Sequence, residues 1–194
     1  LLLLRGDKAK HDSSFKPVAN GYSHATELQV QINRFNEGYF EDGSKMKEER
    51  VEKFSYGVAG YPEKHDESPN LESDIAYLKQ KVEAGAEYVV TQMFFDNQKY
   101  FDFVKRCREE GINVPVIPGI KPITKMSQLN ILPKVFHVDI PEAFASELRK
   151  CKTDEEAKRA GVEWCIMQAK ELKANNVPSI HFYTMSDASS VKQI

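Results

Sequence analysis

Hydrophobic residues along the chain gather in five short runs, and after each run they recur with the period of a helix. The runs predict strands at residues 1–4, 54–61, 88–95, 114–120 and 179–183. Apolar residues spaced three and four apart predict helices at residues 25–39, 71–84, 99–110, 127–136, 141–150 and 153–175. Ser186 is expected to open one more helix, which the chain end cuts short. Strands and helices therefore alternate along the chain.

The strand runs do not alternate between polar and apolar residues, which is typical of a parallel sheet covered by helices. Two α/β folds fit this pattern, an open doubly wound sheet and a closed (β/α)8 TIM barrel. Polar residues at or just past the strand ends favour the barrel, because barrel sites are built at that rim from several strands. These residues are Asp7, Tyr61, Gln92, Lys121 and Thr184.

A whole barrel has eight strand–helix units, whereas the pattern contains five. We therefore expect residues 1–194 to form the C-terminal part of one (β/α)8 barrel catalytic domain. The three other units would precede Leu1. On this interpretation the chain begins inside one strand and ends inside one helix.

Composition changes this picture little, but it excludes some partners. The chain has 194 residues, of which 41% are hydrophobic and 29% charged, and its formal net charge is −2. That charge gives no electrostatic reason to expect nucleic acid or an anionic membrane as a partner. No apolar run approaches the ~20 residues of a membrane span. Cys107, Cys151 and Cys165 lack metal-type spacing, so we expect free thiols on helices in a reducing, intracellular compartment.

Two strand ends carry residues suited to binding a ligand. Arg5, Gly6 and Asp7 follow the first strand, where glycine permits close approach between two charges. A local turn with a salt bridge is the alternative interpretation. Tyr61 and His65 follow the second strand and are able to stack on and hydrogen-bond a planar heterocycle. A loop with a surface histidine is the alternative there.

Three further polar residues are candidates inside predicted elements. Asp74 and Lys81 lie on one face of the helix at 71–84, which is a possible site or a solvated face. Gln92 lies in an apolar run, where an unbonded amide costs free energy. Its amide can donate and accept at once, which suits a heterocycle with both kinds of group, unless it is bonded within the core. The sequence shows no metal-ligand or triad spacing and no glycine-rich phosphate loop.

Five stretches, taken together, resemble the methylenetetrahydrofolate reductase family. They occur in the family's order and span nearly the whole chain. Each alone is weak, but five in one order are specific. The stretches are LLLLRGD, VAGYPEKH, ESDIAYLKQKVEAGAEYVVTQMFFDN, VPVIPGIKPI and IHFYTM.

The resemblance implies a (β/α)8 barrel that binds FAD at the C-terminal ends of its strands. The residues that match the family's FAD contacts are Arg5, Gly6, Asp7, His24, Ala25, Tyr61, His65, Asp74 and Lys81. The residues that match its substrate contacts are Asp7, Gln92, Gln128 and Tyr183. Asp7 is the catalytic candidate, because its charge near both rings would stabilise a cationic form of the folate.

The implied reaction is FAD-dependent reduction of methylenetetrahydrofolate to methyltetrahydrofolate, with NAD(P)H as hydride donor. The resemblance also implies a cytoplasmic homo-oligomer that serves one-carbon metabolism and methionine biosynthesis. The chain departs from the family at Asp187, where many members carry an arginine near the folate tail. The family's proton-donating glutamate lies on strands that precede Leu1. Two alternatives stay open, a flavin-free folate methyltransferase barrel and a non-catalytic or truncated barrel homologue.

Overall fold

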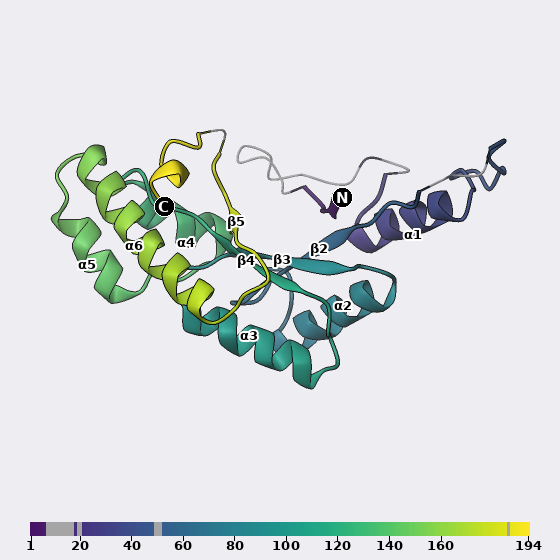
Figure 1. Ribbon diagram of the computed structural model, residues 1–194, viewed down its shortest axis with the longest axis horizontal. Coiled ribbons are helices and arrows are strands. Elements are labelled where there is room, and N and C mark those ends of the chain that lie inside the picture. The colour runs from purple at the N-terminus through teal and green to yellow at the C-terminus, as the bar shows by residue number, and fades with distance from the viewer. Residues whose placement is uncertain (7–17, 19–20, 49–51, 186) are drawn as a thin grey trace.

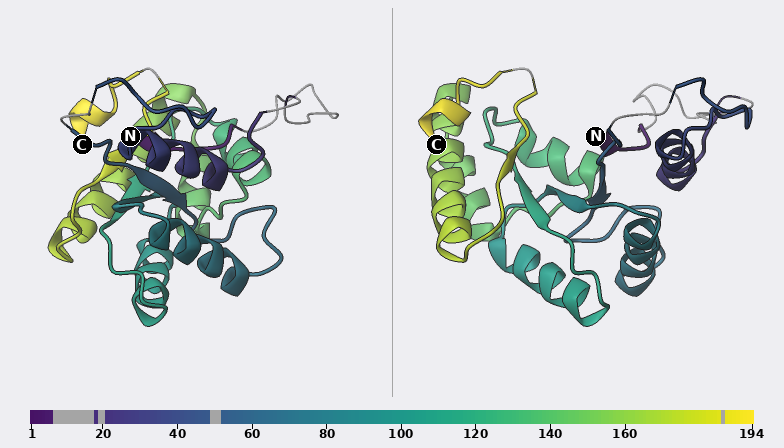
Figure 2. Two further views of the ribbon diagram at one scale, coloured as in Figure 1. Left: turned by 90° about the vertical axis from the view of Figure 1, so that its right-hand side faces the viewer. Right: turned by 45° about the vertical axis from the view of Figure 1, so that its right-hand side comes forward.

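The computed structural model describes residues 1–6, 18, 21–48, 52–185 and 187–194, and a five-stranded parallel sheet forms its centre (Figure 1). Each strand pairs with its neighbours in the sequence. The strands are β1 (Leu2–Leu3), β2 (Gly57–Gly60), β3 (Tyr88–Met93), β4 (Val116–Ile120) and β5 (His181–Phe182). The sheet curls and helices cover its outer side, so the described chain forms part of a barrel (Figure 2). The predicted fold class is confirmed.

Local signals mark the start or the end of several helices. Asn70 accepts a hydrogen bond from the backbone N–H of Ser73 at 2.8 Å and so starts the helix after β2. Gly85 and Gly111, with φ angles of 113° and 82°, turn the chain after the second and third helices. The described helices are α1 (Ala25–Asn36), α2 (Leu71–Glu83), α3 (Asn97–Glu109), α4 (Gln128–Phe136), α5 (Glu142–Lys150), α6 (Asp154–Ala174) and the 3-10 turn η1 (Val191–Gln193).

The observed strands are shorter than the predicted ones, because the apolar runs continue past the paired residues. Phe94 and Phe95 are buried, at 0% and 1% exposure, yet they lie beyond the end of β3. The helix predicted at 25–39 ends at Asn36. Ser186, predicted to cap a last helix, lies outside the described residues, and the chain near its end forms only the turn η1.

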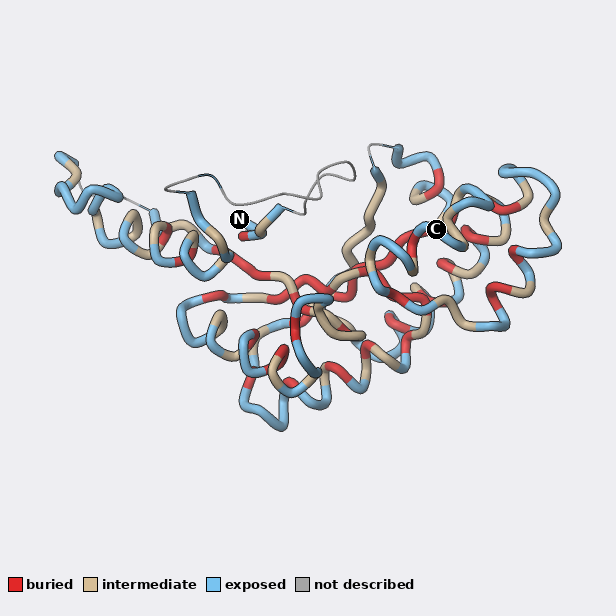
Figure 3. Tube along the Cα trace, turned by 180° about the vertical axis from the view of Figure 1, so that it is seen from behind, coloured by how far each residue is buried: buried red, intermediate tan, exposed pale blue. Residues whose placement is uncertain are grey.

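The larger hydrophobic core lies between the sheet and the helices (Figure 3). Val58 of β2, Val89 of β3 and Ile120 of β4 have 0% exposure and share this core with Phe103 and Cys107 of α3. Successive side chains of a strand point to opposite faces of its sheet. The residues next to these three along each strand therefore point to the concave face of the half-barrel.

A second core joins α4, α5 and α6 to the segment that follows β4. The ring of Phe144 stacks on Trp164, with centroids 4.6 Å apart, and Trp164 donates a hydrogen bond to the carbonyl of Phe95 at 2.9 Å. Gly161 of α6 lies so close to the backbone that a Cβ there would be 2.7 Å from the carbonyl carbon of Ile123. This contact holds the segment after β4 directly against α6.

Two of the three cysteines are buried in the cores. Cys107, Cys151 and Cys165 are all free, as predicted, and they lie on or at the end of helices. Burial raises the pKa of the Cys107 and Cys165 thiols to about 12. A thiol with so high a pKa is a poor nucleophile at neutral pH.

Candidate active site

The C-terminal ends of four neighbouring strands lie along one edge of the curled sheet (Figures 1 and 2). A polar residue lies at or just past each of these ends. Tyr61 follows β2, Gln92 lies in β3, Lys121 follows β4 and Tyr183 follows β5. By strand alternation Tyr61, Lys121 and Tyr183 point to the concave face, because each lies an odd number of residues from a strand side chain that packs against the helices. Gln92 lies at the same edge, within a β-bulge that interrupts this alternation. This arrangement is the rim at which barrel enzymes build their sites.

A β-bulge in β3 shapes the middle of this rim. Val90 pairs with Ile117 and Met93 pairs with Gly119, so β3 holds one more residue than β4 over the same distance. The extra residue leaves the Thr91 backbone outside the regular ladder with β4, while it still pairs with Gly60 of β2.

The bulge gives Thr91 two new partners. Its hydroxyl accepts a hydrogen bond from the backbone N–H of Gly119 at 2.9 Å, and its carbonyl accepts one from the Tyr183 hydroxyl at 2.8 Å. Tyr183 thus crosses from β5 to β3 over Gly119, where a Cβ would lie 2.7 Å from the tyrosine ring. Burial raises the pKa of Tyr183, so its hydroxyl keeps its proton. The structure therefore brings Tyr183 to the strand that carries Gln92.

The amide of Gln92 is oriented by its own backbone. Its Oε1 accepts a hydrogen bond from the N–H of Met93 at 2.9 Å. That backbone group can only donate, so the oxygen must face it and the NH2 group must point away. Within the described residues the NH2 group has no hydrogen-bond partner. Gln92 is half-buried and presents two N–H donors at the rim.

The loop after β2 holds the predicted Tyr61 and His65 together. Their rings meet edge to face with centroids 4.6 Å apart. Asp74, predicted as a cofactor contact, is 8% exposed and accepts from the His65 backbone at 3.2 Å and from the Ser68 hydroxyl at 2.9 Å. Asp74 therefore shapes the loop that carries the ring pair.

Two predicted cationic residues border this loop. Lys81 of α2 donates to the carbonyl of Ala59 in β2 at 3.5 Å. Burial lowers the pKa of Lys81, while the nearby Asp74 carboxylate opposes that shift. Arg5, just past β1, pairs with Glu67 at 2.7 Å. The loop after β2 is thus the meeting point of Arg5, Tyr61, His65, Asp74 and Lys81.

The remaining predicted residues belong to neither of these two groups. Gln128 braces the start of α4, where its Oε1 accepts from the backbone N–H groups of Thr124 at 2.7 Å and Lys125 at 3.2 Å. His24 and Ala25 begin α1. His24 lies near Glu67 of the loop after β2, whose pKa is lowered chiefly by the Arg5 hydrogen bond and to a smaller extent by His24. Among the described residues, nothing lies within 4 Å of a Cβ built on Gly6. Asp7 lies outside the described residues.

A buried ion pair anchors the same loop and was not assigned a role from the sequence. Glu63, whose side chain is 8% exposed, accepts from Lys99 of α3 at 2.5 Å and from the backbone N–H of Asp139 at 3.0 Å. Lys99 also pairs with the Asp139 carboxylate. Burial raises the pKa of Glu63, while the Lys99 hydrogen bond opposes that shift. The only sequence signal was a carboxylate three residues past the end of β2.

Glu63→Gln should destabilise the full-length protein by about 1–3 kcal/mol, because Lys99 loses a buried charged partner but keeps Asp139. Urea denaturation followed by circular dichroism measures the change. The matched control is Asp66→Asn in the same loop, whose 3.4 Å pair with His137 is exposed and should contribute less than about 0.5 kcal/mol. Equal effects of the two substitutions would contradict the anchoring role of Glu63.

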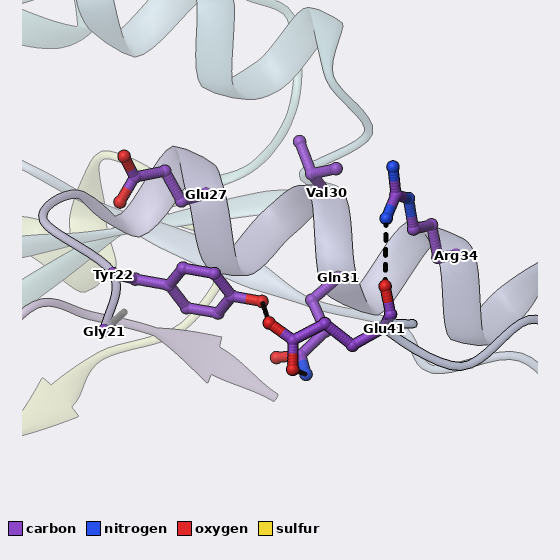
Figure 4. A pocket seen from close by; sticks show the side chains of 7 residues that line it. All are labelled: Gly21, Tyr22, Glu27, Val30, Gln31, Arg34 and Glu41. Atoms are coloured by element: carbon purple, nitrogen blue, oxygen red, sulfur yellow. Dashed lines mark hydrogen bonds between the residues drawn. The ribbon is translucent and has the colours of Figure 1, made fainter. Parts of the chain in front are cut away.

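A hollow on the described surface lies elsewhere, along α1 (Figure 4). Within it the Tyr22 hydroxyl donates to the Glu41 carboxylate at 2.7 Å, and Arg34 donates to the Glu41 carbonyl at 3.3 Å. Its lining contains no predicted site residue, so we do not assign it to the site. The lining residues are Gly21, Tyr22, Glu27, Val30, Gln31, Arg34 and Glu41.

The described residues contain neither a metal-binding cluster nor a helix able to cross a membrane. No group of three or more His, Cys, Asp or Glu side chains in this part of the chain is placed to hold a metal ion. Among its helices, none combines the length and apolarity that crossing a membrane requires.

Comparison with known proteins places the chain in one family. The family model described as methylenetetrahydrofolate reductase matches residues 1–194. The chain is 40% identical over 151 residues to the probable methylenetetrahydrofolate reductase (NADPH) of Caenorhabditis elegans, covering 77% of this chain and 23% of that protein. It is 32% identical over 202 residues to methylenetetrahydrofolate reductase (NADH) 1 of Arabidopsis thaliana, covering 98% and 32%. It is 36% identical over 139 residues to 5,10-methylenetetrahydrofolate reductase of Escherichia coli, covering 71% and 47%.

The chain spans less than half the length of each of these relatives. One solved structure has a similar fold, with a TM-score of 0.52 and 16% identity over 73% of this chain and 51% of that one. It is described as an uncharacterized protein from Clostridium thermocellum that binds two copies of 5-methyl-5,6,7,8-tetrahydrofolic acid. At that identity the likeness concerns the fold alone. Because the family model matches the whole chain, this chain belongs to the methylenetetrahydrofolate reductase family.

Proposed function

We propose that the protein containing this chain reduces methylenetetrahydrofolate to methyltetrahydrofolate, with FAD as cofactor and NADH or NADPH as hydride donor. Family membership over residues 1–194 is the observation that carries the proposal. Relatives are named for both donors, NADPH in one case and NADH in another, so the choice of donor stays open. The chain contributes the five C-terminal units of the barrel domain in this proposal.

The residues around the loop after β2 fit a bound FAD. The Tyr61–His65 ring pair offers aromatic surface to a flat ring, and Lys81 offers a largely buried cation near the end of β2. No described residue lies within 4 Å of a Cβ built on Gly6, which leaves room there for a ligand to approach the backbone. When bound, FAD would supply the ring that carries the hydride, while the protein supplies position and electrostatics. Arg5, Asp7, Asp74, His24 and Ala25 complete the proposed cofactor contacts.

The middle of the rim fits the folate substrate. The NH2 group of Gln92 points away from its own backbone, so it is free to bind the pterin, or the nicotinamide when that ring occupies the same place. Tyr183, held against Thr91, would close one side of that place. Asp7 would stabilise positive charge that develops on the folate. Gln128 is a further proposed substrate contact.

The decisive experiment uses the purified full-length protein. We expect flavin absorbance in the visible range, its bleaching by NADH or NADPH without oxygen, and its recovery when methylenetetrahydrofolate is added. Methyltetrahydrofolate should appear in step with that recovery. A colourless protein that transfers a methyl group from folate would support a flavin-free methyltransferase instead. A protein that shows neither activity would support a non-catalytic homologue.

The proposal also covers the location, the oligomeric state and the partners of the protein. The family's role implies a cytoplasmic homo-oligomer that supplies methyl groups for methionine biosynthesis. Neither nucleic acid nor a membrane is expected as a partner, since the net charge of −2 attracts neither. Sedimentation velocity of the full-length protein tests the oligomeric state.

A further inference from the structure

Lys121 is a buried cation without a partner at the rim. The residue is 7% exposed, and among the described residues its ammonium forms no hydrogen bond and no ion pair. Burial lowers its pKa, and no neighbouring charge opposes that shift. An ammonium that has lost most of its hydration in this way is stabilised when an acceptor reaches it.

The side chain lies on the concave face with Tyr183, at the end of the strand next to the one that carries Gln92. Ile120, the preceding residue, has 0% exposure and packs toward the helices, so Lys121 points to the opposite face. Gly119, two residues earlier, faces the ring of Tyr183 on this side. Lys121 follows β4, which lies between β3 with Gln92 and β5 with Tyr183 at its end.

The tip of Lys121 keeps some contact with solvent. Four described residues hold side-chain atoms that are sealed from solvent without a partner, namely Gln29, Glu63, Gln168 and Ser190. The Nζ atom of Lys121 is not among them, although it also lacks a partner. Its aliphatic stem is therefore buried while the charged end remains open to a ligand.

Hydrogen-bond donors outnumber acceptors on this part of the rim. The oxygen of Gln92 is occupied by Met93, so the amide presents only its NH2 group. Lys121 adds an ammonium, which has three donors and no acceptor. The Tyr183 hydroxyl gives its proton to Thr91 and retains lone pairs. A ligand that satisfies these nitrogen donors presents hydrogen-bond acceptors along one edge.

We propose that Lys121 binds the substrate by donating a hydrogen bond to a carbonyl or carboxylate oxygen of the ring system that lies against Gln92. The identity of that ring system rests on the proposed function. Folate and the nicotinamide nucleotide both carry such oxygens, so separate titrations decide which of them the lysine contacts.

The test compares FAD-loaded full-length protein with its Lys121→Met and Lys121→Arg variants. Dissociation constants for methyltetrahydrofolate and for NAD⁺ or NADP⁺ are read from the change in flavin absorbance. Lys121→Met keeps the stem but removes the charge, and should weaken at least one ligand by ~10-fold or more. Lys121→Arg should restore binding to within about threefold, because it keeps the charge. Lys125→Met, an exposed lysine on the same segment, is the control and should change neither constant.

Unchanged binding of both ligands to Lys121→Met would overturn the inference, as would an equal loss in Lys125→Met. A variant is compared only if its melting temperature and its flavin content match those of the unmodified protein. Lys121→Gln, which is also neutral, replaces the methionine variant if that one fails to fold. Failure of the unmodified protein to bind flavin or folate would count against the proposed function itself. Normal binding by the unmodified protein and the neutral variant alike would count against the role of Lys121 alone.

Discussion

Gly161→Ala should destabilise the full-length protein by about 2–4 kcal/mol, or prevent it from folding at 37 °C. A Cβ at this position would lie 2.7 Å from the carbonyl carbon of Ile123 and 2.8 Å from its nitrogen, with the carbonyl oxygen closer still. These are backbone atoms of the segment that follows β4, so no side-chain rotation relieves the clash. Alanine normally favours a helix over glycine by about 1 kcal/mol, which makes a loss of stability informative.

Thermal and urea unfolding, followed by circular dichroism, measure this effect. Glu163→Ala is the control, because Glu163 lies on the same helix, is exposed and should shift stability by no more than about 0.5 kcal/mol. Gly161→Ala with normal or raised stability would mean that α6 and the segment after β4 do not touch in the way described.

Gln92→Ala should slow folate reduction by ~10- to 100-fold, which corresponds to about 1–3 kcal/mol of lost hydrogen bonding. FAD content should be unchanged, because Gln92 lies on β3 and the proposed cofactor contacts gather after β1 and β2. Stopped-flow absorbance of the flavin, with NAD(P)H and with methylenetetrahydrofolate in separate experiments, measures both half-reactions.

Gln92→Glu separates the two ends of the amide. The carboxylate still accepts from the N–H of Met93, so the local backbone keeps its bond, but the NH2 donors are gone. A comparable loss in the glutamate and alanine variants would show that the NH2 group matters for the substrate. Gln98→Ala, on the exposed side of α3, is the control. Loss of FAD with normal folate kinetics in the remaining loaded protein would rule out a substrate role for Gln92.

The helices could be predicted because residues close in the sequence determine where several of them begin and end. Asn70 starts α2 through a bond to Ser73, and Gly85 ends it with a positive φ. Both interactions involve residues within one turn of the helix end, so the sequence alone indicates them. The parallel order of the strands also followed from a local property, the lack of polar alternation.

The finer parts of the site depend on residues far apart in the chain, and these escaped prediction. Gln92 was found as a polar residue in an apolar run, but the bulge that orients it depends on the register with β4. Lys99 meets Glu63 across 36 residues, and either residue alone resembles an ordinary surface charge. The closeness of Gly161 to Ile123 is likewise visible only in three dimensions. Such contacts arise when distant segments pack together, so the spacing of apolar residues along the sequence does not reveal them.

The hydrogen bond from Tyr183 to Thr91 forms late when the protein is synthesised on the ribosome. The two residues are 92 positions apart, so the ribosome makes β3 and β4 well before the tyrosine. Pairing of β3 with β4 requires only residues that have already emerged, whereas the Thr91 carbonyl gains its partner with the last strand. At about 5–20 residues per second, that interval lasts some seconds. The sheet therefore precedes the finished rim, and a nascent chain stalled before Tyr183 would hold the strand that carries Gln92 without the bond that ties it to the last strand.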